Sequence, residues 1–489
     1  MNSVTINKII NLFFKNLTHR QIILRNSFWI VAGKFISGVL RALLVILAAR
    51  FLGAGEYGSF SLAMNFVLLF SFLPELGLTA ILTREISKAN NQEEKYSIFN
   101  NILIISLILS IISYFLIITL GYFFLKDSVA KIILPILALM LIFDILREFA
   151  YAVYRAELKS ELQGIFHFLT NLLLFIIGFS VLINFRTSIS LAYGYFIAIT
   201  IGFIISNLFL FNYFRNFKFS INYRLWLYYF NSSWPIALAN ALYLMLLFID
   251  SIILGWFFPN YVVGIYTSSI KINEFLIVFP TGIALAMLPI FSKNLSDKSS
   301  LRKNLEFSFQ LTYLIILPII LGGFLLSEKL ILFIFGNEYL SAHYAFKILI
   351  PSLLASSLFM IFSQLLIALN KRIELLIYEF IVIIINFIGN LLIIPYFDFL
   401  GAAYITTLSS FLSFLFGYFI LNKYVEFNIY SGILKPLIAS LIMAGILILL
   451  SNLNTVILIL LGILLYFIAL ILLKEEISLK ILKVIVKIK

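Results

Sequence analysis

The sequence predicts an all-α integral membrane protein with about fourteen transmembrane helices. The chain of 489 residues is 63% hydrophobic and only 12% charged, against roughly 45–50% and roughly 25% in ordinary globular domains. Apolar runs of about 20 residues recur along its whole length, and each is long enough for a helix to cross ~30 Å of hydrocarbon. A transmembrane β-barrel would instead show alternating segments of about ten residues, and the sequence has none.

We place each span on an apolar run bounded by short polar connections. The fourteen predicted spans are residues 27–49, 57–79, 97–125, 132–154, 164–183, 189–213, 234–256, 264–290, 306–327, 343–369, 375–397, 400–421, 436–452 and 455–473. No connection exceeds roughly twenty residues, which leaves no room for an inserted soluble domain. This argues against a membrane enzyme with a sizeable catalytic loop.

The spans group into a small number of predicted domains. These are an N-terminal cytoplasmic or interfacial segment (1–26), an N-lobe of six spans (27–213), a cytoplasmic linker (214–233), a C-lobe of six spans (234–421), two further spans (436–473) and a basic C-terminal tail (474–489). Both terminal segments mix Lys or Arg with apolar residues, a pattern typical of helices lying in the membrane interface.

The distribution of Lys and Arg predicts the topology. One set of alternate connections, which includes both termini, carries 25 of these residues, and the other set carries five. Short loops rich in Lys and Arg stay in the cytoplasm, so we expect both termini to be cytoplasmic. The net charge of +13 therefore reports topology, and we expect no nucleic-acid partner.

Metal and thiol chemistry are not expected. The chain has no cysteine, which excludes disulfides and thiolate metal sites. Its three histidines, His19, His167 and His343, are far apart in sequence. We expect no metal site, no catalytic residues and no cofactor, although coupling of transport to H⁺ or Na⁺ is possible.

An internal repeat indicates two related halves. The first two spans meet at Gly53 and continue through Gly58 to a proline at Pro74, and the motif Gly264 to Pro280 has the same spacing after the seventh span. Proline can kink each of the second helices. Parallel repeats of this kind place a substrate site between two lobes. Residues 53–58 also fit G-x-G-x-x-G, but they join two membrane spans and are interpreted as a turn.

Five cations interrupt otherwise apolar segments: Lys34, Arg41, Arg147, Lys271 and Lys347. A charge near the bilayer centre costs about 2.5–3.5 kcal/mol on insertion scales, so it usually faces a water-filled cavity or a partner. Lys34 and Arg41 share one face of the first span. Arg41 lies near mid-depth, and its planar guanidinium suits phosphate. The alternative for Arg41 is a structural ion pair with one of three acids, Glu75, Asp144 or Asp250.

The other intramembrane charges also allow two interpretations. Asp144, Arg147 and Glu148 share one side of the fourth span and can neutralise one another. Lys271 can contact cargo or pair with Glu274, three residues away, and Lys347 can snorkel to the interface.

The intramembrane acids and amides are candidates for coupling and for cavity lining. Asp250, Glu75, Glu274 and Asp144 could bind a coupling ion or balance the cations. On the eleventh span, Glu379, Asn386 and Asn390 form a polar stripe that suits either a polar cavity wall or hydrogen bonds between helices.

Several short motifs together resemble the polysaccharide transporter family, the O-antigen and teichuronic-acid type flippases of the multidrug/oligosaccharidyl-lipid/polysaccharide (MOP) superfamily. The first-turn segment, residues 49–58, is similar to that family's A-R-x-L-G-x-x-x-Y-G stretch. The remaining motifs are DSIILG (250–255), VGIY (263–266), FGNEY (335–339), ALNK (368–371) and GAA (401–403). The similarity covers about residues 25–425, so the last two spans lie outside it.

The resemblance implies two pseudo-symmetric six-helix lobes around a central cationic cavity. It implies an oligosaccharide on undecaprenyl pyrophosphate as cargo, moved from the inner to the outer leaflet of the bacterial cytoplasmic membrane, and membrane lipids as the other partner. Relatives that flip the peptidoglycan precursor use basic residues of the first and eighth spans, and Arg41, Lys34 and Lys271 occupy comparable places. We expect the protein to act as a monomer.

Two other function classes remain as alternatives. Drug/cation antiporters of the superfamily commonly carry an acid in the first span, whereas this first span has two cations and no acid. A membrane polymerase or ligase of the same pathway would be revealed by sugar transfer in vitro.

Overall fold

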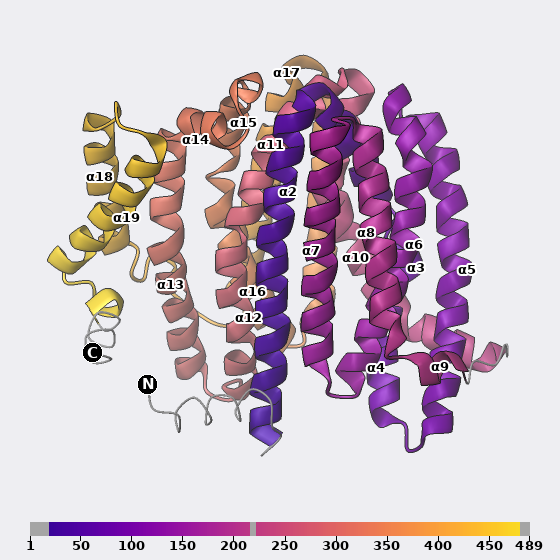
Figure 1. Ribbon diagram of the computed structural model, residues 1–489. Coiled ribbons are helices and arrows are strands. Elements are labelled where there is room, and N and C mark those ends of the chain that lie inside the picture. The colour runs from indigo at the N-terminus through magenta and orange to yellow at the C-terminus, as the bar shows by residue number, and fades with distance from the viewer. Residues whose placement is uncertain (1–18, 216–221, 480–489) are drawn as a thin grey trace, which may run out of the picture. The chain divides into compact units, whose positions relative to one another are not determined.

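The computed structural model describes residues 19–215 and 222–479, and all regular elements within these ranges are helical (Figure 1). Eleven helical segments among them are long and apolar enough to cross a membrane, so the chain is a multi-pass α-helical membrane protein. Two of these segments, Phe35–Lys88 and Arg372–Asn422, each cover two predicted spans, and the apolar helix Leu434–Leu449 is shorter than the rest. The count of fourteen spans stays a prediction.

The chain divides into two compact units, Met1–Tyr261 and Val262–Lys489. The helices that begin in unit 1 are α2 (His19–Leu69), α3 (Phe72–Glu75), α4 (Leu78–Lys88), α5 (Gln92–Phe124), α6 (Ser128–Ala156), α7 (Ser160–Asn184), α8 (Ser188–Leu208), α9 (Phe211–Arg215), α10 (Tyr223–Phe257) and α11 (Asn260–Leu276). Those of unit 2 are α12 (Val278–Lys293), α13 (Lys298–Leu325), α14 (Ser327–Ile334), η1 (Asn337–Tyr339), α15 (Ala342–Leu349), α16 (Ser352–Ala368), α17 (Arg372–Asn422), α18 (Leu434–Leu449) and α19 (Thr455–Leu472).

Three predicted boundaries differ from this division. Helix α10 lies in unit 1, although the sequence repeat assigns it to the second lobe, and it begins inside the predicted linker. Residues 19–26 form the start of α2 instead of a separate interfacial helix. Residues 1–18 and 480–489 of the predicted terminal segments lie outside the described residues.

The turn predicted between the first two spans is a bend within one long helix. In α2, Gly53 has φ 75° and ψ 170°, a conformation that glycine adopts without steric cost. Just beyond the bend, Glu56 Oε2 accepts hydrogen bonds from the Ser188 backbone N–H and hydroxyl at 2.8 and 2.5 Å. The motif 53–58 therefore redirects the chain and anchors the N-terminus of α8, where a carboxylate also offsets the helix dipole.

The two helices in which the sequence predicts a proline kink are interrupted near those prolines. Helix α2 ends at Leu69, and Pro74 lies in the short helix α3 beyond it. Likewise α11 ends at Leu276 and α12, which contains Pro280, begins at Val278. The proline kinks predicted in spans 57–79 and 264–290 are thus confirmed, as interruptions of the helix, because proline lacks the N–H that would continue the hydrogen-bond ladder.

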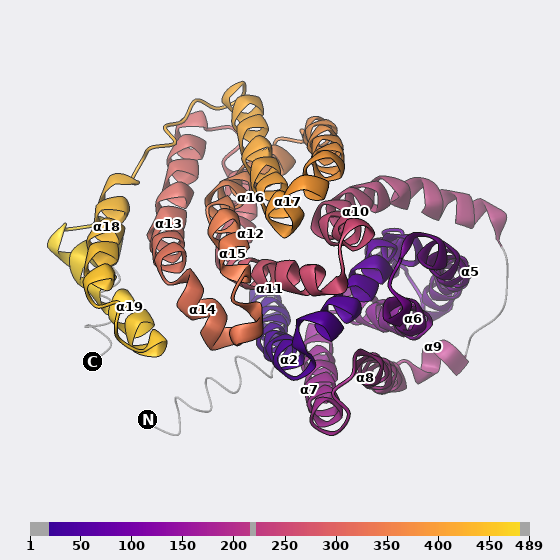
Figure 2. The same ribbon diagram turned by 90° about the horizontal axis from the view of Figure 1, so that it is seen from above.

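Helices α2 and α7 pack side by side in unit 1 (Figures 1 and 2). A Cβ placed on Gly33 would lie 2.8 Å from the backbone oxygen of Gly164, and one on Gly178 would lie 2.8 Å from Leu44 Cδ1. Small residues of this kind let two backbones approach closely where lipid provides no hydrophobic driving force. The close contact fixes the register of the side chains between the two helices.

The last two helices, α18 and α19, pack against α13 in unit 2 (Figure 2). Their core is a hydrophobic cluster that includes Met443, Leu447 and Leu458. Tyr466 of α19 donates a hydrogen bond to the backbone oxygen of Leu314 on α13 at 2.8 Å. These helices therefore form an integral part of unit 2.

We expect Gly33→Ala to destabilise unit 1, because the added methyl group meets the α7 backbone, which cannot move aside as a side chain can. Overpacking of this kind costs about 1–3 kcal/mol of unfolding free energy. Thermal unfolding of the purified protein in detergent measures the loss. Gly38→Ala on the same helix is the matched control, because a Cβ there has no neighbour within 4 Å and its melting temperature should stay the same or rise. Equal melting temperatures for Gly33→Ala and the wild type would contradict the close contact.

Candidate functional site

A group of polar side chains lies between α2 and α7 in unit 1. Ser37 and Arg41 are one turn apart on α2, and His167 and Asn171 are one turn apart on α7. We call these four residues the α2–α7 polar cluster. Ser37 and Asn171 are each 1% exposed, whereas Arg41 is exposed on the surface of unit 1.

The cluster fixes the orientation of the Asn171 amide. Arg41 donates from Nε and Nη2 to Asn171 Oδ1 at 3.3 and 3.2 Å. A guanidinium can only donate hydrogen bonds, so the amide oxygen must face it and the amide nitrogen must face away. Asn171 Nδ2 donates to the His167 backbone oxygen at 2.8 Å and lies 3.3 Å from His167 Nδ1.

Ser37 completes the cluster from the α2 side. Its hydroxyl lies 2.8 Å from His167 Nδ1 and donates to the His167 backbone oxygen at 3.2 Å. Because Ser37 and Arg41 both bond to α7 across the close helix contact, the position of Arg41 is set by the packing of the two helices. The amide partner is neutral, so the positive charge of Arg41 is not cancelled.

Arg41 keeps donors available. Its two bonds to Asn171 use two of the five N–H groups of a guanidinium, and within residues 33–215 and 222–479 it forms no ion pair with any described acid. None of the suggested partners, Glu75, Asp144 or Asp250, pairs with it among these residues. The remaining N–H groups of Nη1 and Nη2 can bind an anion bidentately.

The environment of Arg147 is opposite to that of Arg41, because Arg147 is buried and paired with acidic side chains. It is 2% exposed, its Nη2 lies 2.5 Å from Asp144 Oδ1, and Glu148 is 3.9 Å away. The ring of Tyr151 lies 5.4 Å from its guanidinium carbon. The ion pair that the spacing on α6 allows is therefore present, and it neutralises Arg147.

The two predicted cations of unit 2 also have local partners. Lys271 Nζ lies 2.7 Å from Glu274 Oε2, with side chains 30% and 36% exposed. Lys347, on α15, lies 5.8 Å from the centre of the Phe324 ring. Of the predicted cargo-binding cations whose side chains are described, only Arg41 keeps an uncancelled charge; the side chain of Lys34, on α2, lies outside the described residues.

The predicted acids lie in different places. Asp250 on α10 is 1% exposed, and Glu75 on α3 accepts a hydrogen bond from Thr79 at 3.1 Å. Glu379 on α17 is half-buried. Within the described ranges, no group of three or more His, Asp or Glu residues could hold a metal ion.

The predicted amide stripe lies inside unit 2. Asn386 and Asn390 are 1% and 0% exposed. Asn386 Nδ2 donates to Ser409 Oγ at 3.0 Å, and Asn390 Nδ2 donates to Asn386 Oδ1 at 3.1 Å. The bond between Asn386 and Ser409 joins the two halves of α17 on either side of its bend at Asp398, and the bond from Asn390 links two turns within the first half.

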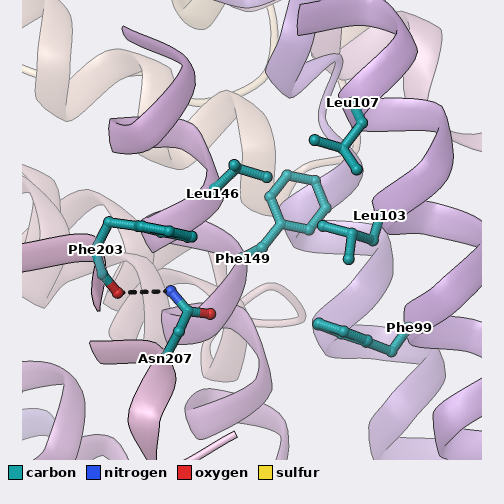
Figure 3. Close-up of a pocket in the computed structure, with 7 residues that line it drawn as sticks. All are labelled: Phe99, Leu103, Leu107, Leu146, Phe149, Phe203 and Asn207. Atoms are coloured by element: carbon teal, nitrogen blue, oxygen red, sulfur yellow. Dashed lines mark hydrogen bonds between the residues drawn. The ribbon is translucent and has the colours of Figure 1, made fainter. Parts of the chain in front are cut away.

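Unit 1 also contains a small apolar hollow of about 90 Å³ between α5, α6 and α8 (Figure 3). Six of the lining residues are apolar, and the seventh, Asn207, bonds to the Phe203 backbone oxygen at 2.9 Å. With no cation in its lining, this hollow suits hydrocarbon better than an anion.

Sequence reasoning did not identify Asn171 or Ser37 and considered His167 only as a metal ligand. A usable signal was present: Gly33, Ser37 and Arg41 recur at four-residue spacing, as do the polar residues His167 and Asn171. Such stripes mark the contact faces of membrane helices.

The chain matches known families and folds along most of its length. Residues 23–295 match the family described as polysaccharide biosynthesis protein, and residues 235–392 match the MatE family. A protein named as a probable low-salt glycan biosynthesis flippase, Agl15, from Haloferax volcanii is 26% identical over 201 residues, which are 40% of this chain and 43% of that relative. The chain thus spans less than half the length of this relative.

Two solved structures share the fold. The lipid II flippase MurJ in an inward closed conformation superposes with a TM-score of 0.77 at 19% identity, covering 92% of this chain and 99% of that one. An inward-facing multidrug resistance transporter of the MATE family gives 0.68 at 15% identity, covering 81% and 98%. Because the first family match spans more than half of the sequence, the chain belongs to the polysaccharide biosynthesis protein family.

Proposed function

We propose that this protein is a flippase for a lipid-linked oligosaccharide. It would move an oligosaccharide carried on undecaprenyl pyrophosphate from the inner to the outer leaflet of the bacterial cytoplasmic membrane, with both termini in the cytoplasm, for cell-surface polysaccharide synthesis. The observation that carries the proposal is Arg41, a guanidinium on a candidate membrane span that is exposed and hydrogen-bonded only to a neutral amide among the described residues.

Physical chemistry supports an anionic ligand at this position. An uncancelled charge at membrane depth is costly in hydrocarbon and needs water or a partner. Arg41 lies twelve residues before the bend at Gly53, or about 18 Å along the helix, which is too far for simple snorkelling. A phosphate oxygen pair matches the geometry of its available donors.

The names of the relatives agree with this proposal. The family description refers to polysaccharide biosynthesis, and both the Haloferax relative and MurJ are named as flippases. In the proposed cycle Arg41 holds the pyrophosphate while the polyprenyl chain stays in lipid, and alternating access exposes the site to one leaflet and then to the other. The protein would act as a transporter, not as an enzyme.

Energy coupling to H⁺ or Na⁺ would require an intramembrane acid. Asp144 and Glu274 already pair with Arg147 and Lys271, and a bound cation would have to compete with those side chains. We therefore propose Glu75, which forms no ion pair with a described residue and accepts a hydrogen bond from Thr79, as the coupling group.

A multidrug antiporter is the second candidate, because residues 235–392 match the MatE family. The first span argues against it, since a site for cationic drugs needs an acid where this chain has Lys34 and Arg41. Expression in a drug-sensitive host separates the two functions. A gain in tolerance to cationic drugs without a change in surface polysaccharide would favour the antiporter.

We expect Arg41→Ala to lower surface polysaccharide at least tenfold when it replaces the wild-type gene in a deletion strain. Loss of a charge-assisted hydrogen bond costs about 1.5–3 kcal/mol, and each 1.4 kcal/mol is about tenfold in affinity. Immunoblots or sugar analysis of the cell surface measure export. Arg186→Ala is the control, because Arg186 is also exposed in unit 1 but contacts Phe51. Full export by Arg41→Ala would refute the proposed role.

Lys271→Ala should reduce export less than Arg41→Ala does, because Glu274 already neutralises Lys271. A partly exposed ion pair contributes only about 0–1 kcal/mol, so we expect a change below about fivefold. The double variant Lys271→Ala/Glu274→Ala keeps the local charge balance and should export at least as well as Lys271→Ala. A loss with Lys271→Ala as large as that with Arg41→Ala would instead show that Lys271 exchanges Glu274 for cargo.

A further inference from the structure

We propose that Asn171 is a positioning residue that forces Arg41 to bind its anion through one particular edge of the guanidinium. This inference rests on the proposed anion site at Arg41. It adds a residue of α7 that the sequence did not indicate, and it defines the ligand group as a pair of oxygens on one phosphorus or one carbon.

The guanidinium has two edges that can bind a pair of oxygens. The side edge presents Nε–H and one N–H of Nη2, and the end edge presents one N–H each from Nη1 and Nη2. Asn171 Oδ1 accepts from Nε and Nη2 at 3.3 and 3.2 Å, so it occupies the side edge. Only the end edge of Arg41 remains for a ligand.

Asn171 cannot easily release this edge by rotating its amide. The amide nitrogen donates to the His167 backbone oxygen at 2.8 Å, and the residue is 1% exposed. A flipped amide would turn its N–H groups toward the N–H groups of Arg41. It would also leave a buried oxygen facing the His167 carbonyl, which is an expensive arrangement for unpaired polar atoms.

The neighbouring residues hold the amide in this orientation. His167 Nδ1 lies 3.3 Å from Asn171 Nδ2 and 2.8 Å from Ser37 Oγ. Ser37 and Arg41 belong to α2, and His167 and Asn171 belong to α7, so the arrangement spans both helices. A site fixed by two packed helices keeps its geometry better than one on a flexible loop.

An amide also has the correct charge for this task. An Asp at this position would accept the same two hydrogen bonds but would form an ion pair with Arg41, as Asp144 does with Arg147. The neutral Asn171 directs the guanidinium and leaves its charge for the ligand. The fitting ligands are a phosphate of a pyrophosphate group and the carboxylate of an acidic sugar, because each presents two oxygens side by side.

A double-mutant cycle on the purified full chain tests the proposal, with inorganic pyrophosphate as the probe and calorimetry as the readout. We expect Asn171→Ala to weaken pyrophosphate binding about tenfold, the effect of misdirecting one charge-assisted contact. In an Arg41→Lys background the same change should cost less than about twofold, because an ammonium has no edges to direct. Equal losses in the two backgrounds, or no loss in the wild-type background, would overturn the positioning role.

Two further variants test the neutral charge of the amide and its place in the cluster. Asn171→Asp forms an ion pair with Arg41, so it should weaken pyrophosphate binding about tenfold or more, and its melting temperature should fall because its second oxygen faces the His167 backbone oxygen; unchanged affinity of the folded variant would contradict the proposal. Asn184→Ala is the matched control on α7, because Asn184 Nδ2 makes the same type of bond to the Ser180 backbone oxygen at 2.7 Å but lies away from the α2–α7 polar cluster. Its affinity should equal that of the wild type.

The outcomes also distinguish this inference from the proposed function. If Arg41→Ala binds pyrophosphate as tightly as the wild type, the anion site itself is wrong. If Arg41→Ala loses binding but Asn171→Ala does not, only the positioning role fails. A parallel titration with glucuronate identifies the source of the anion. The end edge binds the ligand whose affinity falls more on Asn171→Ala in the wild type than in the Arg41→Lys background.

Discussion

The hydrogen bonds from Arg41 to Asn171 hold a cation in place within the membrane without cancelling its charge. Arg147 and Lys271 are also held, but each by a carboxylate, at 2.5 and 2.7 Å. At an effective dielectric constant of about 20, two unit charges 4 Å apart attract by about 4 kcal/mol. An anionic ligand must overcome such an attraction to bind at the buried Arg147 and a weaker one at the partly exposed Lys271, whereas at Arg41 it meets no competing acid among the described residues.

The glycine contact between α2 and α7 makes this arrangement possible. Gly33 lies so close to Gly164 that even a methyl group would not fit between them, and Ser37 and Arg41 follow on the same face of α2. At this separation a short side chain such as Asn171 can span the gap between the helices. At a wider separation only a longer side chain could reach the guanidinium. A longer side chain loses more conformational entropy when it is ordered.

The sequence predicts the membrane class, the position of most spans and the residues with intramembrane charge, because these depend on composition and local spacing. The ion pairs Asp144–Arg147 and Lys271–Glu274 could be suggested for the same reason, since both partners lie on one helix. The partner of Arg41 could not be predicted, because Asn171 is 130 residues away and amides are common on membrane helices.

Helix interruptions were harder to predict than helix positions. Hydropathy treats residues 57–79 and 264–290 as unbroken spans, yet both are interrupted near a proline. The signal was available in Pro74 and Pro280, but whether a proline bends a helix or ends it depends on which neighbouring groups take up the released backbone carbonyls. At the first site the carbonyl that Pro74 releases, that of Phe70, accepts from the Leu73 N–H at 3.1 Å. Ser106 of α5 donates to the carbonyl of Pro74 itself at 2.9 Å, a contact that only the folded unit provides.

The charge on the first span is the feature that separates the two candidate transport functions. A site for a cationic drug would have to place an acid close to its ligand, and the first span offers Arg41 facing an amide instead. Asn and Asp have nearly the same shape but differ by one unit of charge, and an Asp at this position would cancel the charge of Arg41 and leave the His167 carbonyl without its donor. The packing therefore fixes the geometry of the site, whereas the amide at Asn171 leaves a positive charge that selects for anions.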